Sequence, residues 1–296
     1  MADLRRLFIS FSGGETSAFM AHWLKTHVAS SYDEVQIVFA NTGQEHEETL
    51  EFVTRCNRAF GLGVVWVEAV THMGELKGCT HRIVDYSTAS RDGQPFKDVI
   101  AKYGIPNRTY PHCTRELKLN PMRSYIRELG WERYDTAIGI RCDEVDRMRH
   151  DAMIDGVIYP LITACPMSKP DINRFWSKQP FRLDLKGYEG NCKWCWKKSL
   201  RKHMTLISEA PERYEFPEQM EVEYGMVNQQ PGYPARRFFL GNRTVADLRV
   251  MASQPFTPAF DDARVMSTRN MFASEILGEL DASGGGCSDH CEVFHD

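Results

Sequence analysis

The chain has 296 residues, 42% of them hydrophobic, which is enough apolar material for one large domain or for a core with a smaller appendage. No stretch approaches the roughly 18 apolar residues of a membrane span, and the first residues lack a secretory signal, so the sequence predicts a cytoplasmic protein without membrane partners. A formal net charge of −4 argues against a strongly basic nucleic-acid binder, although a local basic face is compatible with it. Nine cysteines, an odd number, favour reduced thiols, metal ligation or catalysis over a disulfide framework.

The first predicted element is a strand at residues 7–9, followed by a Ser-Gly-Gly turn and the start of a helix. Gly13 and Gly14 have no side chains to block a close approach to the backbone, while Ser12 and Ser17 offer hydroxyl groups. The helix start adds unpaired N–H groups and a partial positive charge. This turn therefore suits a phosphate, although the same residue types also fill ordinary turns.

Two further strands are predicted at residues 34–41 and 64–70, with a helix at residues 45–60 between them. Strands that alternate with helices indicate an α/β fold, in which a largely parallel sheet is covered by helices on both faces. Ligands of such sheets collect at the carboxyl ends of the strands. The Ser-Gly-Gly turn and a second turn at residues 41–43 would both lie there.

The pattern weakens at residues 71–108, which predicts a mobile and partly helical insertion near the site. A helix follows at residues 114–129, kinked or restarted by Pro121, and then a strand at residues 134–140. Residues 157–161 close the core.

A charged segment at residues 141–149 contains three arginines and three acidic residues directly after a predicted strand. A solvated loop is the simplest interpretation. Its place past the carboxyl end of a strand favours phosphate and Mg²⁺ handling, because arginines bind phosphates and carboxylates bind the metal.

Three cysteines form a second group of candidates. Cys192 and Cys195 are three positions apart, which fits one tetrahedral metal centre or a redox pair, or else two buried thiols in a tryptophan-rich core segment. Cys113 lies at the mouth of the helix predicted at residues 114–129, where the helix dipole stabilises a thiolate. The sequence therefore allows three thiolates to converge.

Two later segments have open interpretations. A basic run is either a patch for a polyanionic substrate or the solvated face of a helix. It comprises Lys197, Lys198, Arg201, Lys202 and His203. The tail, residues 283–296, has a glycine run followed by Cys287, His290, Cys291 and His295, which could ligate a metal, deliver a thiol to the active site from a mobile arm, or be incidental in a disordered end.

The turn Ser12-Gly13-Gly14-Glu15-Thr16-Ser17 after a strand resembles the SGGxxS pyrophosphate loop (PP-loop) of the N-type ATP pyrophosphatases. Within that superfamily the chain is most similar to the phosphoadenosine-phosphosulfate (PAPS) reductase family, particularly its phage-encoded branch. The other matching motifs occur in the family's order at residues 39–43 with 45–49, 113–118, 139–141 with 143–144, and 190–199.

This resemblance implies a five-stranded parallel sheet of the adenine-nucleotide α-hydrolase type, with the loop cradling phosphates, residues 41–43 beside the adenosine, and Arg141 near phosphate or sulfate. The implied nucleotide-binding residues are Ser12, Gly13, Gly14, Glu15, Thr16, Ser17, Asn41, Thr42, Gly43, Gly139 and Arg141. Two departures matter. Glu15-Thr16 replaces the Lys-Asp of many members, which removes a positive charge, and the tail lacks the family's Glu-Cys-Gly-Leu-His, so that Cys287 or Cys291 would have to supply the catalytic thiol.

Three functions follow from the resemblance. The first is thiol- or iron–sulfur-dependent reduction of PAPS or adenylyl sulfate, with Cys287, Cys291 and Arg141 as catalytic residues and a thioredoxin-like reductant as partner. The second is ATP- and Mg²⁺-dependent adenylation with sulfur transfer from a donor to tRNA or DNA. The third is a protein that keeps the fold without the catalysis, either a nucleotide-binding regulator or a nucleic-acid-binding protein.

The resemblance also implies a possible [4Fe–4S] cluster on Cys113, Cys192 and Cys195, with Cys165, His112 or a sulfide on the fourth iron, and zinc as the alternative. The expected organisation is a nucleotide-binding core at residues 1–165, a smaller helical part with the CxxC motif at residues 166–282, and the tail at residues 283–296. A homo-oligomer is compatible with this organisation.

Overall fold

The computed structural model describes residues 4–149, 151–152 and 154–266. The elements in chain order are β1 (Arg6–Ser10), α1 (Glu15–His27), η1 (Ala29–Ser31), β2 (Glu34–Asn41), α2 (Glu47–Phe60), β3 (Val64–Val70), β4 (Thr80–Val84), α3 (Gln94–Tyr103), α4 (His112–Thr114), η2 (Arg115–Leu119), α5 (Asn120–Glu128), β5 (Asp135–Ala137), η3 (Val145–Arg147), β6 (Val157–Ile158), α6 (Pro160–Thr163), α7 (Lys169–Trp176), α8 (Leu200–Glu209), η4 (Pro211–Tyr214), α9 (Glu215–Tyr224) and α10 (Val245–Ala252). None of the helices in these ranges is long and apolar enough to cross a bilayer.

The strands form one mixed sheet in the order β4-β3-β2-β1-β5-β6. All neighbouring pairs are parallel except β3 and β4, which pair antiparallel. The predicted α/β class is thus confirmed, whereas the implied five-stranded, all-parallel sheet is wrong. The connection from β3 to β4 is too short for the crossover of a dozen or more residues that a parallel pair requires, so the chain returns as a hairpin.

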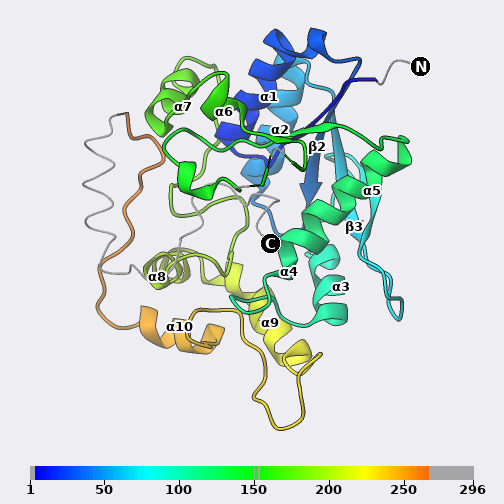
Figure 1. Ribbon diagram of the computed structural model, residues 1–296. Helices are drawn as coiled ribbons and strands as arrows, with labels where there is room; N and C mark the ends of the chain where they lie inside the picture. Colours follow the sequence, from blue (N-terminus) through cyan, green and yellow to red (C-terminus); the bar gives the residue numbers. More distant parts are fainter. Residues whose placement is uncertain (1–3, 150, 153, 267–296) are drawn as a thin grey trace.

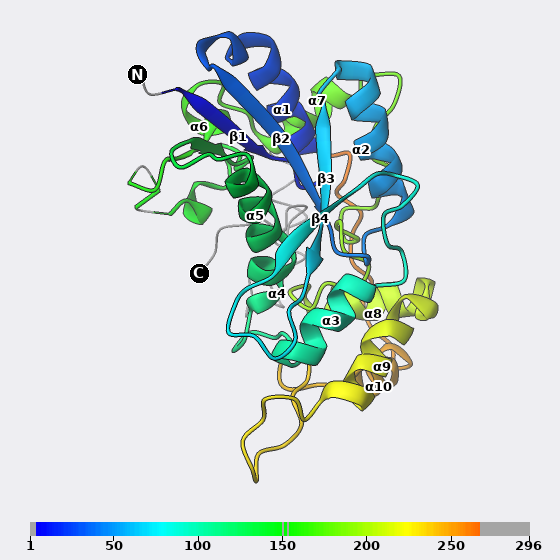
Figure 2. The same ribbon diagram turned by 90° about the vertical axis from the view of Figure 1, so that its right-hand side faces the viewer.

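Successive residues of the central strands face opposite sides of the sheet, as strand geometry requires. Leu7 and Ile9 pack with residues of α1, α2 and α7 in one core, while Phe8 and Val38 pack with residues of α5 in another. Figures 1 and 2 show α1, α2, α6 and α7 on one side of the sheet and α5 on the other.

A smaller helical part lies beyond one end of the sheet (Figure 1), and α3, from the weakly patterned segment, joins it. Its core contains Phe96 of α3, Phe238, and Leu248 of α10. The Trp194 ring stacks on Phe96 with centroids 5.2 Å apart. The expected helical, cysteine-containing part is therefore present. The boundary predicted at residue 165 stays a prediction, and the one at residue 282 lies outside the described residues.

The helix predicted at residues 114–129 divides into α4, the π-helical segment η2 and α5. These segments form one uninterrupted helix, because Thr114, Leu119 and Asn120 all keep right-handed helical backbone angles, so the expected restart at Pro121 does not occur. Pro121 instead follows the π-helical segment directly within the continuous helix. Short π-helical insertions recur at functional sites, and this one adjoins Cys113.

Candidate nucleotide site and cysteine cavity

The loop from β1 to α1 is folded tightly over the start of the helix. Gly13 has a φ of +88°, and a Cβ there would lie 2.8 Å from Cγ2 of Thr49. The Ser12 and Ser17 hydroxyl oxygens are 3.0 Å apart, and the Ser17 hydroxyl donates to the Gly14 carbonyl oxygen at 3.0 Å. No side chain caps α1 at Gly14, so its first N–H groups can serve an anion.

Two buried polar atoms near this loop have no hydrogen-bond partner among the described residues. They are Oγ1 of Thr49, which lies in the first turn of α2, and Nε2 of His46, the residue just before α2. Burial above all, helped by Arg213, lowers the pKa of His46 to about 2, so its ring is neutral. A buried polar atom without a partner costs free energy, and a bound ligand can supply that partner.

The turn at residues 41–43 follows β2 at the same edge of the sheet as the phosphate loop, because β1 and β2 are parallel neighbours. The Asn41 side-chain amide donates to Glu68 at 2.6 Å and to the Ser90 carbonyl oxygen at 2.8 Å. The Thr42 backbone N–H donates to Glu45 at 2.8 Å. Residues 41–43 are thus held rigidly at the predicted place.

Arg141 is buried beside the phosphate loop. Strand β5 ends at Ala137, and the backbone at Gly139 then passes close to Ser17 before Arg141. A Cβ added at Gly139 would lie 3.3 Å from Cα of Ser17, so a larger residue would crowd this approach. Nη1 of Arg141 donates to the Thr16 hydroxyl at 3.4 Å, and Nε donates to Asp143 at 2.9 Å. The structure therefore brings Arg141 and Gly139 to the loop, as the resemblance implies.

Two residues that sequence reasoning missed also hold the loop. Arg182 donates to the Glu15 carboxylate from Nε at 2.9 Å and from Nη2 at 2.8 Å. The Asn191 side-chain amide donates to the Ser12 carbonyl oxygen at 2.8 Å. Asn191 could have been found from the Gly-Asn-Cys motif that contains it, whereas an arginine in a polar loop gives no signal.

A cavity of about 40 Å³ lies next to the loop, with Thr16, Arg141 and Arg182 in its wall. The last described residues return to it: Ala263 lines it, and Nζ of Lys169 lies 2.8 Å from the Asp262 carboxylate. This space is far smaller than the several hundred Å³ of typical ligand pockets, so a nucleotide requires some of these residues to move.

Cys113, Cys192 and Cys195 line a second cavity, of about 30 Å³, together with Thr42 and with Lys118 of η2. Burial, and then the neighbouring Cys195, raise the pKa of the Cys192 thiol well above its usual value. The three thiols thus converge as the sequence allowed, next to the turn at residues 41–43.

These thiols match the donor set of an iron–sulfur or zinc site. The described residues nevertheless include no group of three or more His, Cys, Asp or Glu positioned to hold a metal ion. Neither Cys165 nor His112 lines the cavity: Cys165 packs against the core beside α1 and α2, and Nε2 of His112 lies 3.1 Å from the Gly104 carbonyl oxygen. Cys287 and Cys291 lie outside the described residues.

Comparison with known proteins gives the family. The phosphoadenosine phosphosulfate reductase domain matches residues 6–77. An uncharacterised nin region protein of Escherichia phage lambda is 36% identical over 198 residues, which cover 66% of this chain and 67% of that protein. The chain belongs to the PAPS reductase family.

Other similarities to this PAPS reductase family member are more distant. An uncharacterised protein of Methanocaldococcus jannaschii is 27% identical over 135 residues, 46% of this chain, and the match spans only 22% of that longer protein. The crystal structure of a PAPS reductase from Candida auris, a phosphate complex, has a TM-score of 0.37 and 16% identity, and covers 64% of this chain and 81% of that one.

Proposed function

We propose that this protein binds an adenine nucleotide at the phosphate loop and reduces a sulfonucleotide, PAPS or adenylyl sulfate, in a thiol-dependent reaction. The observation that carries the proposal is that three groups with suitable chemistry lie at the same edge of the sheet. There the uncapped start of α1, the buried Arg141 guanidinium and a cavity lined by three thiols lie together.

In the proposed reaction a cysteine thiolate attacks the sulfur of the bound sulfonucleotide. The bond between that sulfur and the phosphate oxygen breaks, and the nucleotide leaves with the electron pair. A second thiolate then attacks the cysteine sulfur, which releases sulfite and leaves a disulfide that a thioredoxin-like dithiol reduces. Cys287 and Cys291 remain the predicted source of the attacking thiol.

In this mechanism, the N–H groups at the start of α1 and the Ser12 and Ser17 hydroxyls bind the phosphates, while Arg141 stabilises negative charge that develops on the departing phosphate oxygen. Cys113, Cys192 and Cys195 are the residues that would hold an iron–sulfur cluster or zinc. When bound, zinc would supply a Lewis acid and a cluster would supply electron-transfer chemistry, and no step above depends on either.

A second candidate is ATP-dependent adenylation followed by sulfur transfer to tRNA or DNA. One observation favours it: Asp143 and Glu144 flank Arg141 beside the phosphate loop, with Glu144 3.4 Å from the guanidinium. Carboxylates next to a triphosphate site are ligands that Mg²⁺ prefers.

The test measures binding of PAPS, adenylyl sulfate and Mg²⁺-ATP by calorimetry, then sulfite release with a dithiol and pyrophosphate release from ATP. Ser12→Ala with Ser17→Ala should abolish nucleotide binding, and Cys287→Ser with Cys291→Ser should abolish sulfite release without loss of binding. Pyrophosphate release without sulfite would favour the second candidate. If none of the three nucleotides binds at physiological concentration, both candidates fail, and a non-catalytic protein that regulates or binds nucleic acid without these nucleotides remains.

A further inference from the structure

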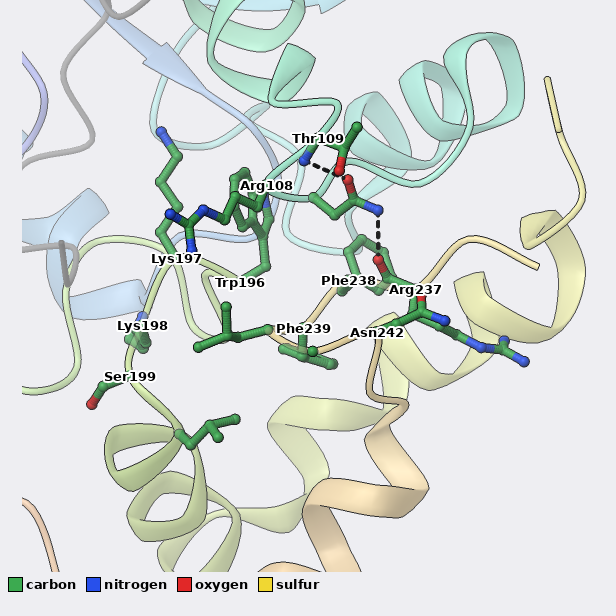
Figure 3. A pocket seen from close by; sticks show the side chains of 14 residues that line it. Arg108, Thr109, Trp196, Lys197, Lys198, Ser199, Arg237, Phe238, Phe239 and Asn242 are labelled. Carbon is green, nitrogen blue, oxygen red and sulfur yellow. Dashed lines mark hydrogen bonds between the residues drawn. The ribbon is translucent and has the colours of Figure 1, made fainter. Parts of the chain in front are cut away.

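A larger cavity, of about 460 Å³, lies on the far side of Trp196 from the thiols. It is built by three segments distant in sequence: residues 107–109, 196–200 and 237–242. Figure 3 shows its labelled side chains, with Arg108 and Lys197 beside Trp196, and Phe239 below them. Its volume is in the range of pockets that hold a small ligand or one nucleotide.

The charge of this cavity is one-sided although the whole chain is acidic. Four of its lining residues are cations, Arg108, Lys197, Lys198 and Arg237, and none of the described lining residues is acidic. The cavity also adjoins the start of α8, whose first turn carries no acidic residue. Such a surface favours an anionic ligand.

The rest of the lining suits an aromatic ring. Trp196, 9% exposed, supplies a ring surface, half-buried Leu200 adds an aliphatic one, and the buried rings of Phe238 and Phe239 lie behind them. Asn242 adds an exposed side-chain amide to the lining. The Asn107 side-chain amide donates to the Arg237 carbonyl oxygen at 2.9 Å, which ties two of the three segments together. An anion that also presents a flat ring and hydrogen-bonding edges has the chemistry of a nucleotide.

Trp196 connects this cavity with the thiols. Its side chain borders both cavities, and its indole N–H donates to the Cys113 sulfur at 3.4 Å. Lys198, 3% exposed, donates from Nζ to the Cys192 carbonyl oxygen at 2.8 Å. A ligand in the larger cavity would therefore lie one side chain away from the cysteine cavity.

We propose that this cavity binds one nucleotide of a single-stranded nucleic acid, with its base against Trp196 and Leu200 and its phosphate near Arg108 and Lys197. A role for this nucleotide as sulfur acceptor rests on the second candidate function above, whereas the binding itself does not. Two neighbouring lysines of the basic run would then have different roles. Lys197 would contact the ligand, whereas Lys198 holds the loop of Cys192 through its hydrogen bond to the Cys192 carbonyl oxygen.

The test uses the full chain, without PAPS or ATP, and the anisotropy of labelled oligothymidylate and oligouridylate of about 12 nucleotides, a length that spans one binding site. Arg108→Glu with Lys197→Glu should weaken binding about 10-fold or more, and lower the salt slope of log Kd by about two, one for each phosphate contact. The matched control is Arg127→Glu with Lys178→Glu, the same charge change at exposed residues of α5 and just after α7, and it should leave Kd within about twofold.

A milder variant guards against misfolding. Asn242→Asp adds one negative charge at an exposed position whose φ of +57° aspartate tolerates, so it should fold and still weaken binding. The proposal is overturned if the wild-type chain binds neither oligonucleotide, if the control pair weakens binding equally, or if polyglutamate competes as well as the oligonucleotide. Full competition by free UMP at the same nucleotide concentration would overturn the assignment to a strand.

The same measurement on Ser12→Ala with Ser17→Ala separates the two proposals. Oligonucleotide binding should persist in that variant, since the phosphate loop is a different site. If no nucleotide binds at the phosphate loop, the oligonucleotide measurement still tests the cavity beside Trp196. If no oligonucleotide binds, the sulfite-release assay still tests the reductase proposal.

Discussion

The Glu15 carboxylate and the Arg182 guanidinium form a two-pronged ion pair at 2.9 and 2.8 Å beside the phosphate loop. The sequence resemblance implies that Glu15 stands where many family members have lysine. Its negative charge would oppose a phosphate, and Arg182 compensates for it from a loop 167 positions later. Because Arg182 neutralises the Glu15 carboxylate, the negative charge of Glu15 does not by itself exclude a phosphate from this loop.

Arg182→Ala should weaken nucleotide binding about 10-fold, because it removes the cation that faces the largely buried Glu15 carboxylate next to the proposed phosphate site. Glu15→Gln alone should not weaken it, and Glu15→Gln with Arg182→Ala should recover most of the loss. Calorimetry of the three variants forms a double-mutant cycle. Equal loss in the single and double variants would show that Arg182 acts on the ligand and not through Glu15.

Gly13→Ala should destabilise the protein by about 2–3 kcal/mol and abolish nucleotide binding, since it combines a positive φ with a Cβ 2.8 Å from Thr49. Gly61→Ala is the control, because Gly61 also has a positive φ, +59°, but no atom within 4 Å of the added Cβ. It should cost only about 1 kcal/mol and spare binding. Urea unfolding and calorimetry distinguish the two.

Thr49→Val should stabilise the nucleotide-free protein by about 1 kcal/mol, because it replaces a buried hydroxyl without a hydrogen-bond partner by a methyl group of the same shape. If a nucleotide supplies the missing partner, the same variant should bind it more weakly. Opposite signs in thermal unfolding and in nucleotide affinity are expected. A variant that is unchanged in both would remove Thr49 from the site.

Cys113→Ser, Cys192→Ser and Cys195→Ser should each lower the iron and sulfide, or the zinc, of protein purified without oxygen, if a metal binds at their cavity. Cys165→Ser is the matched control, since Cys165 packs against another core and should leave the metal content unchanged. Equal metal in all four variants, or metal lost with Cys165, would place the site elsewhere.

The sequence predicted the central strands well because buried parallel strands are continuous apolar runs, and the run at residues 34–41 coincides with β2. It did not predict β4, whose residues Thr80–Val84 are mostly half-exposed and form a strand only by pairing with β3. Local motifs likewise singled out Ser12, Ser17 and Arg141, and the structure brings these residues together at the start of α1.

Contacts between segments that are distant in the sequence could not be predicted, because no local residue pattern indicates them. Arg182 is one arginine in an irregular segment, and the cavity beside Trp196 requires three segments to meet. The basic run could be recognised, but periodicity could not separate Lys197, which lines that cavity at half burial, from the buried Lys198.

Glu221 in α9 gives the structure a pH-dependent weakness. Burial raises the pKa of its carboxyl to about 7, against the opposing effects of the hydrogen bonds from the Val245 and Phe238 N–H groups and of Arg237, while Asp247 raises it slightly further. A raised folded-state pKa means that the neutral acid is favoured in the folded chain. Below the unfolded-state pKa near 4.5, the Glu221 carboxyl is neutral in both states and does not reduce the free energy of unfolding. As pH rises from 4.5 towards 7, ionisation favours the unfolded chain, and the free energy of unfolding falls.

Glu221→Gln should therefore stabilise the protein at about pH 8 by an amount on the order of 1–2 kcal/mol, and the gain should shrink towards zero at about pH 5. Urea unfolding at both pH values measures it. Glu215→Gln, at an exposed position of the same helix, should show no such pH dependence. A gain that is equal at both pH values would mean that glutamine improves the packing near α10 and that the Glu221 carboxyl does not titrate in this range.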